Sequence, residues 1–179
     1  MSTIDLIVLG MLKQESRGAY DIQKLVEYRN ISKWVKISTP SIYKKTLQLE
    51  KKGLIKATTS REGKMPPKTV YSLTEAGEKE FENLMFSIAS NPIRIFLDFN
   101  AVIVNLDSLS PTNQKHCIEA ISTNVAALKA YLEENLKEKS KLHEIPETGI
   151  AVLQQQLILI EAIEKWLATL SIKKFGNEM

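Results

Sequence analysis

The sequence predicts a mainly α-helical protein with one small β-hairpin, organised as an N-terminal domain over residues 1–86 and a helical region over residues 87–179. Three observations lead to this fold class. Apolar residues recur at helical spacing over most of the 179-residue chain. Two short runs rich in β-branched residues flank a turn that contains glycine and proline, which is typical of a hairpin. Basic residues gather in the first half of the chain, whereas acidic residues prevail in the second.

Three helices are expected before the hairpin. The first would start after Ser2 or Thr3, because apolar residues then follow the spacing i, i+3, i+4, i+7, i+8. A second amphipathic helix follows the break at Gly18, with the preceding serine at position 16 as a candidate cap. The third would have Thr39 as its N-cap and Pro40 as its first helical residue, and it would stop at the next glycine.

The hairpin and a fourth helix complete the N-terminal pattern. Strands are expected over residues 54–60 and 69–73, and Thr74 would cap the helix that follows. The expected buried face of that helix comprises Phe81, Leu84 and Met85. Helix, helix, helix, hairpin, helix is the order of a winged helix-turn-helix, which is one of several small α+β arrangements that the pattern permits.

The charge of the chain is unevenly distributed. The whole chain carries a formal net charge of +3, which by itself says little about its partners. The segment from Arg29 to Lys68, however, holds eleven basic residues and two acidic ones, a net charge of +9. Such a cluster favours a polyanionic partner such as nucleic acid. The alternative is a solvated basic surface with no partner.

The second half of the chain is expected to be helical. Residues 92–109 are apolar almost all round, which predicts a helix buried on more than one side. Two long helices follow, separated by a turn at Pro146 and Gly149, and apolar residues repeat along both at alternating steps of three and four. Helices of this length are expected to pair with a second copy of the chain; the alternative is a self-contained antiparallel hairpin packed on the N-terminal domain. The predicted dimerisation residues are Ile118, Ile121, Val125, Leu128, Leu132, Leu153, Leu157, Ile160 and Leu167.

Three sequence blocks in the first half resemble the PadR family of bacterial transcriptional regulators. They are Ala19-Tyr-Asp-Ile22, then Thr39-Pro-Ser-Ile-Tyr43 with Leu47 to Ile55, and finally Val70-Tyr-Ser-Leu-Thr-Glu-Ala-Gly77. Similar blocks occur more loosely in MarR-type regulators. The resemblance implies a winged helix-turn-helix that binds double-stranded DNA, and a C-terminal helical region that exchanges between two protomers. In relatives, an aromatic cavity at the dimer interface binds planar small molecules.

The third helix and the hairpin supply the candidate DNA contacts. Hydroxyl groups and backbone amides at a helix N-terminus suit a phosphate, and lysine reaches either a phosphate or a guanine. Lysines that flank the hairpin tip could lie along the minor groove or the DNA backbone; the alternative is a solvated turn. The predicted contacts are Ser38, Thr39, Ser41, Tyr43, Lys44, Lys45, Lys64 and Lys68. Tyr43 has an equally good interpretation as a core residue.

No motif for catalysis, a cofactor or a metal site is present in the sequence. It contains no glycine-rich phosphate loop and no nucleophile elbow, and its two histidines and one cysteine do not form a zinc pattern. We therefore predict neither an enzyme nor a cofactor. Cys117 is interpreted as an inert structural thiol rather than a redox switch. No signal peptide or membrane span is evident, which predicts a soluble, cytoplasmic protein.

The function predicted from the sequence is that of a homodimeric DNA-binding regulator, with repression as the expected effect, acting on a pseudo-palindromic operator. The alternative is an adaptor that uses the winged helix and the long helices to bind protein instead of DNA. A small aromatic effector is a further expectation. The aromatic residues large enough to line its site are Trp34, Phe96, Phe99 and Trp166, and plain packing is the alternative for them.

Overall fold

The first helix begins where the sequence predicts a cap. In the computed structural model, which describes residues 2–35, 37–38, 40–60 and 68–176, α1 (Thr3–Gln14) follows Ser2. The backbone amide of Ser2 donates to Asp5 Oδ2 at 2.7 Å, and its hydroxyl donates to the same oxygen at 3.2 Å. Asp5 therefore satisfies a donor that the first turn of a helix otherwise leaves free.

The second helix uses a different cap from the one predicted. α2 (Ala19–Tyr28) begins after Gly18 and not after the serine at position 16. The backbone amide of Gly18 donates to Asp21 Oδ2 at 3.2 Å, so an aspartate at the third helical position again completes the helix start. A short 3₁₀ helix, η1 (Ile31–Lys33), leads towards the next element.

The third helix starts slightly later than the sequence suggests. α3 (Ser41–Lys51) follows Pro40, which lies in the right-handed helical region but precedes the first helical residue. The amide of Ser41 donates to the carbonyl of Ser38 at 3.0 Å, which closes a turn ahead of the helix. Thr39, the predicted N-cap, lies outside the described residues. The helix ends as predicted at Gly53, whose φ of +70° suits a residue without a Cβ atom.

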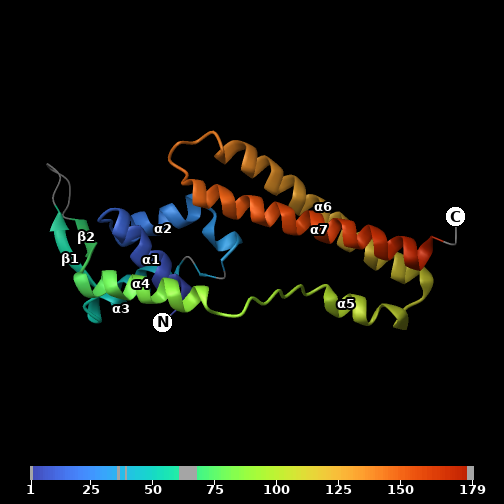
Figure 1. Cartoon of the computed structure of the whole chain (residues 1–179), viewed down its shortest axis with the longest axis horizontal. Helices are drawn as coiled ribbons and strands as arrows, with labels where there is room; N and C mark the ends of the chain where they lie inside the picture. The colour runs from blue at the N-terminus through green and yellow to red at the C-terminus, as the bar shows by residue number, and fades with distance from the viewer. Residues whose placement is uncertain (1, 36, 39, 61–67, 177–179) are drawn as a thin grey trace. The chain divides into compact units, whose positions relative to one another are not determined.

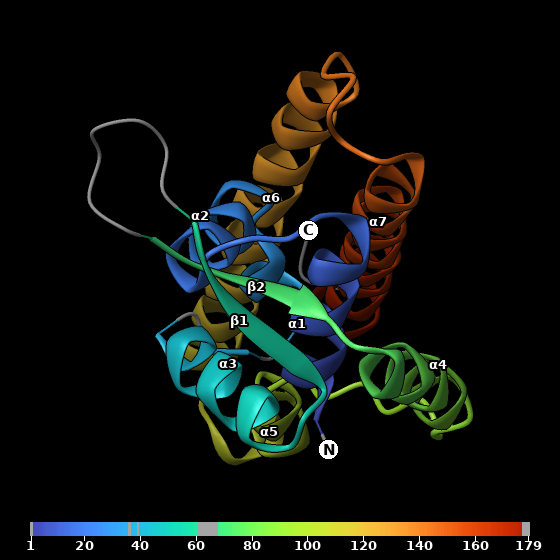
Figure 2. The ribbon, with the colours of Figure 1, turned by 90° about the vertical axis from the view of Figure 1, so that its left-hand side faces the viewer.

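The hairpin has the predicted two strands. β1 (Ile55–Ser60) pairs antiparallel with β2 (Lys68–Leu73), and Ile55 lies opposite Leu73. A further contact was not predicted: Arg17 forms a β-bridge with Tyr71, which connects the residues just before α2 to the second strand. Figure 2 shows the hairpin lying across α1, with α3 on one side of it and α4 on the other.

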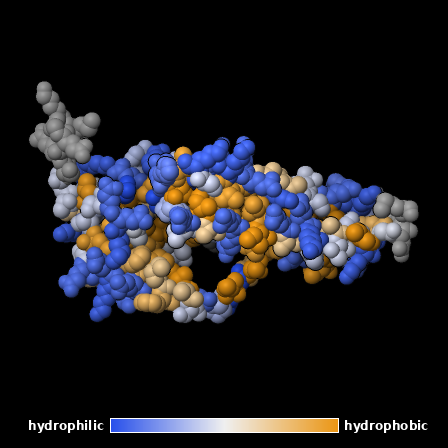
Figure 3. Space-filling view, turned by 45° about the horizontal axis from the view of Figure 1, so that its top comes forward, coloured by the Kyte–Doolittle hydropathy of each residue, from blue (hydrophilic) through white to orange (hydrophobic). Residues whose placement is uncertain are grey.

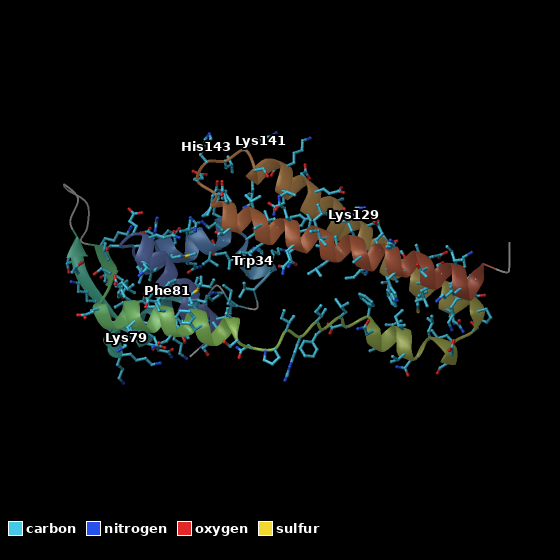
Figure 4. All side chains as sticks on the ribbon, in the orientation of Figure 1. Trp34, Lys79, Phe81, Lys129, Lys141 and His143 are labelled. Carbon is cyan, nitrogen blue, oxygen red and sulfur yellow. The ribbon has the colours of Figure 1, made fainter. Side chains whose placement is uncertain are left out.

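The fourth helix, α4 (Glu75–Ala89), is capped by Thr74 as predicted. The Thr74 hydroxyl accepts from the backbone amide of Gly77 at 3.1 Å. Leu84 is buried, and Phe81 packs against the core from α4 (Figure 4). Met85 was expected on the same buried face, but its side chain is 49% exposed. That expectation was wrong because the buried stripe of the helix passes through Phe81 and Leu84 and leaves Met85 beside it.

One hydrophobic core joins the helices and the hairpin of residues 1–93, which form the first of two units in the chain. The helices contribute apolar side chains from one face each, and the strands add residues from the face turned towards the helices. The fully buried members include Val8, Leu9, Ile22, Val26, Ile42, Leu49 and Ile55. The observed architecture is mainly helical with a two-stranded wing, as predicted.

The second unit, residues 94–179, opens with a segment that the sequence analysis misjudged. The long helix expected over residues 92–109 is absent. The chain has no regular helix over residues 92–97, and only α5 (Asn100–Val104) and the 3₁₀ turn η2 (Leu106–Ser108) are helical. Leu106 is buried, whereas Phe96 is 81% exposed. The apolar side chains of residues 92–97 are largely exposed within one chain. The all-round apolar pattern therefore did not predict the length of the helix.

Two long helices make up the rest of this unit. α6 (Pro111–Lys139) is capped by Ser110, and α7 (Glu147–Phe175) runs back antiparallel to it (Figure 1). Their apolar seams pack against each other, with Val125, Leu132, Ile160 and Leu167 buried at the centre. Ion pairs add to the unit, with Lys129 Nζ 2.7 Å from Glu164 Oε2 across the helix pair (Figure 4) and Lys174 paired with Asp107.

This packing involves the two seams that the sequence analysis assigned to dimerisation. The seams were predicted to pair with a second copy of the chain, and within one chain Val125, Leu132, Ile160 and Leu167 pack together between α6 and α7. The reason is that two seams of the same spacing complement each other when a short connection reverses the chain. Leu128 is the exception, because its side chain remains exposed. Across the described residues, no helix is both long and apolar enough to cross a membrane.

Candidate DNA-binding surface

The exposed side of α3 presents the residues that the sequence analysis placed there. Ser38, Ser41, Tyr43 and Lys44 are all exposed, and they lie at or before the N-terminal turn of the helix. Ile42 points the opposite way and is fully buried in the core. Hydroxyl groups, one ammonium group and the backbone amides of a helix start thus lie together, and this set of donors can bind phosphate oxygens.

Lys45 lies in a different environment from its neighbour Lys44. Its side chain is 20% exposed, and Nζ lies 2.9 Å from Oδ1 of Asp5, which is itself only 2% exposed. The spacing from Ile42 explains this, because a residue three positions further along belongs to the same inward stripe. Lys45 thus differs from the other predicted α3 contacts in having its ammonium group engaged inside the domain.

The charge of Asp5 is maintained against its burial. Burial by itself raises the pKa of the Asp5 carboxyl, but the ion pair with Lys45 and the hydrogen bonds from Ser2 outweigh it, and the net pKa lies below the ordinary value. The carboxylate therefore stays ionised and joins the start of α1 to the middle of α3. The sequence does contain a signal for this residue, since Ser2 and Asp5 have the spacing of a capping box.

A buried tyrosine of the second strand lies near α3. Tyr71 on β2 is buried, and burial raises the pKa of its phenol, with a further rise from the nearby negative charge of Glu50. The hydroxyl of Thr46 on α3 donates to the carbonyl of Tyr43 at 2.7 Å. Tyr43 itself is exposed, so its ring does not belong to the core, which was the alternative interpretation of this residue.

The second strand places one more predicted lysine at the surface. Lys68 is 55% exposed, and its Nζ donates to Asp21 Oδ2 at 2.5 Å, so it is paired with the residue that caps α2. Because this pair is open to solvent, its net contribution to stability is expected to be small. Lys64, the other predicted wing contact, lies outside the described residues. Sequence reasoning missed Asp21 as a partner because it is 47 positions from Lys68.

The four candidate effector residues are divided between the two units of the chain. Phe99 and Trp166 stack within the second unit, with ring centroids 6.2 Å apart and an interplanar angle of 26°. Phe96 is in the same unit but highly exposed, whereas Trp34 packs against the core of the first unit (Figure 4). The described residues contain no cluster of histidine, cysteine and acidic side chains that could hold a metal ion.

The comparison with protein families matches this domain. Residues 8–83 match the transcriptional regulator PadR-like family, and this range contains α1 to α3, the hairpin and most of α4. The N-terminal domain belongs to the PadR-like family. Members of this family are transcriptional regulators and not enzymes, in agreement with the sequence prediction. No curated protein matches the chain.

Solved structures match the chain almost from end to end. The operator-bound structure of Bacillus subtilis PadR has a TM-score of 0.80 at 21% identity and covers 97% of this chain and 99% of its own. The structure of the same protein with p-coumaric acid has a TM-score of 0.82 at 19% identity, and the match covers 97% of this chain and 99% of that one. The structure of the Vibrio cholerae virulence activator AphA has a TM-score of 0.70 at 16% identity, and the match covers 99% of this chain and 100% of that one. At these identities the likeness establishes the fold, including the long helices of the second unit.

Proposed function

We propose that this PadR-like chain is a DNA-binding transcriptional repressor that acts as a homodimer on a pseudo-palindromic operator. The observation that carries the proposal is the exposed start of α3, where Ser41, Tyr43 and Lys44 stand beside free helix amides in the most basic part of the sequence. Bacillus subtilis PadR, which shares this fold, has been crystallised with operator DNA. A regulator that binds chromosomal DNA works in the cytoplasm, where we place this one.

The proposal of a homodimer rests on apolar side chains that one chain leaves in solvent. Figure 3 shows hydrophobic side chains that reach the surface along the C-terminal unit. A group of exposed apolar side chains on one surface commonly marks a protein–protein interface. Among the described residues of this unit, the most exposed apolar side chains are those of Ile95, Phe96, Val104, Ile158 and Ile172. A second copy would cover them, and its α3 helix would then occupy the next major groove on the same side of the DNA.

The test of this proposal is selection of bound fragments from a genomic DNA pool, followed by footprinting. We expect an inverted repeat whose half-sites are about 10 base pairs apart, centre to centre. Sedimentation of the free protein at micromolar concentration should give a dimer, and Phe96→Asp combined with Ile158→Asp should give a monomer. Failure to enrich any sequence would favour the adaptor interpretation, and a monomeric wild type would refute the dimer.

Repression is tested with the operator placed upstream of a reporter gene. Because the fold also occurs in a virulence activator, the sign of regulation is an independent question from DNA binding. We expect expression of the reporter to fall when the protein is supplied, and to recover with Lys44→Ala. A rise in expression would retain the DNA-binding proposal and overturn repression.

An aromatic effector is the second part of the proposed function. Phe99 and Trp166 already stack, and the indole is 41% exposed, so a planar ring could add to the pair. Bacillus subtilis PadR has been crystallised with p-coumaric acid, which provides the first probe. Because Trp34 is the other tryptophan of the chain, Trp34→Phe isolates the fluorescence of Trp166.

Titration of p-coumaric acid into Trp34→Phe should quench the remaining fluorescence in a saturable manner and should weaken operator binding. The matched control is Phe99→Leu in the same background, which removes the stacking partner and should weaken the quenching. Saturable binding that leaves the operator affinity unchanged would overturn a regulatory role for this ligand. A linear, unsaturated response would overturn binding at the Phe99–Trp166 pair.

A further inference from the structure

We infer that Lys45 is a positioning residue, and that its ion pair with Asp5 holds α3 in the orientation that reads DNA. The inference rests on the proposed DNA-binding function and replaces Lys45 as a predicted DNA contact. It assigns a role in DNA binding to Asp5, a negatively charged residue that no phosphate would contact. Its consequence is unusual, because removing this negative charge should weaken the binding of a polyanion.

The geometry leaves the Lys45 ammonium group little freedom to serve DNA. Nζ is 2.9 Å from Asp5 Oδ1, and Oδ2 of the same carboxylate accepts from the amide and hydroxyl of Ser2. In this nearly inaccessible carboxylate, Oδ2 is therefore hydrogen-bonded to Ser2, and Oδ1 has the Lys45 ammonium group as its counter-charge. Withdrawing Lys45 towards a phosphate would leave a buried charge without its counter-ion, which is far more costly than losing an exposed ion pair.

The position of the pair within the fold explains why it would act on DNA binding. Asp5 is in the first turn of α1, which is fixed in the core by Val8 and Leu9, and Lys45 is in the middle of α3. Ile42 and Leu49 anchor α3 with apolar contacts, which resist separation of the helices but permit small sliding movements. An ion pair with a buried carboxylate is costly to separate, and this cost favours the one register of α3 against α1 that keeps Lys45 beside Asp5.

A second pair in the same domain provides a matched contrast. Asp21 is at the third position of α2, as Asp5 is in α1, and each accepts from the backbone amide at its own helix start. Asp21 pairs with Lys68 on the hairpin, but both side chains are substantially exposed. Lys68 can therefore exchange Asp21 for a phosphate at little cost, whereas Lys45 cannot exchange Asp5.

The experiment compares four single variants with the wild type on the selected operator, across a series of salt concentrations. Asp5→Asn and Asp21→Asn change the same chemical group at equivalent helix positions and remove the same charge. Lys45→Met and Lys44→Met remove neighbouring positive charges of α3. Each variant is measured at a temperature at which its own thermal unfolding curve shows it to be fully folded, so that lost affinity does not reflect unfolded protein.

We expect Asp5→Asn to weaken operator binding about tenfold, the scale of one good base contact, although it makes the protein more positive. Asp21→Asn should strengthen binding about twofold, because it releases Lys68. Lys45→Met should lower the affinity with an unchanged salt slope, whereas Lys44→Met should lower the slope by about 1. Lys45→Arg, which preserves the ion pair, should restore affinity close to that of the wild type.

Either of two results would overturn the inference. One is an Asp5→Asn protein that binds as tightly as the wild type or more tightly, since simple charge removal then accounts for the effect. The other is a Lys45→Met protein whose salt slope falls by about 1, which would make Lys45 a phosphate contact. If Asp5→Asn does not fold, the double variant Asp5→Asn/Lys45→Met, which leaves no unpaired charge, should bind no more weakly than Lys45→Met alone; further weakening would contradict the inference. If the wild type selects no DNA, the proposed DNA-binding function itself is wrong.

Discussion

Lys44 and Lys45 are adjacent in α3 but lie on different faces of the helix, and their surroundings determine their roles. Lys44 is exposed and available to a phosphate, whereas Lys45 is held by a buried carboxylate. A sequence read for charge alone treats the two as equivalent, because both are lysines in a basic segment. The helical repeat distinguishes them, since Lys45 shares the inward stripe with Ile42 and Leu49.

The Asp5 carboxylate should make the N-terminal domain sensitive to acid. The pKa of Asp5 is lower in the folded state than its ordinary value of 3.8, so its contribution to stability is fully present above that pH. It is lost as the pH falls through the lower, folded-state pKa. We expect the free energy of unfolding, followed by Trp34 fluorescence in a Trp166→Phe background, to decline in this range.

Asp5→Asn in the same background is the control for this acid effect. The variant has no carboxylate at position 5 to protonate, so its stability should fall less steeply below pH 3.8 than that of the parent. Equal slopes for the two proteins would show that other carboxylates dominate the acid response and that Asp5 is not held in its charged form by folding.

Among the elements, the junction between α3, β1 and α4 depends on close backbone contacts. Thr74 donates from both its amide and its hydroxyl to the carbonyl of Leu54, at 3.1 and 3.0 Å. Gly77 approaches the same carbonyl so closely that an added Cβ would lie 2.0 Å from the oxygen. This contact gives a physical reason for the glycine at the end of the Thr74-Glu-Ala-Gly77 block.

Gly77→Ala should therefore destabilise the N-terminal unit by about 3 kcal/mol or more, because backbone must move to admit the methyl group. Gly149→Ala in α7 is the matched control, since its Cβ would meet its nearest neighbour at an ordinary 3.7 Å. That variant should be neutral or more stable by up to about 1 kcal/mol. Thermal unfolding measures both, and a Gly77→Ala protein as stable as the wild type would refute the close contact.

The α6–α7 pair makes a second prediction at the scale of elements. Leu167 is almost fully buried between the two helices, so Leu167→Ala should cost about 2–5 kcal/mol in stability. The exposed neighbour Lys165 provides the control, and its replacement by alanine should change stability by less than about 0.5 kcal/mol. Chemical denaturation followed by Trp166 fluorescence tests this, and equal effects of the two substitutions would contradict the intrachain seam.

Over the whole molecule, local patterns predicted the N-terminal domain more accurately than the C-terminal unit. The caps at Ser2 and Thr74 and the stop at Gly53 depend on neighbouring residues, so the sequence contains their signals. The partner of the α6 seam depends on contacts between distant residues. The apolar segment over residues 92–97 forms no regular helix and is largely exposed, so its apolar pattern was no measure of burial. Ion pairs such as Asp21–Lys68 were equally invisible, because they join residues far apart in the chain.

The central claim, that the start of α3 binds DNA phosphates, is tested most directly by operator affinity as a function of salt for the wild type and Lys44→Ala. We predict that the logarithm of the association constant falls linearly with the logarithm of salt concentration. The slope for Lys44→Ala should be smaller by about 1, the signature of one lost phosphate contact. An unchanged affinity and an unchanged slope for Lys44→Ala would contradict the claim.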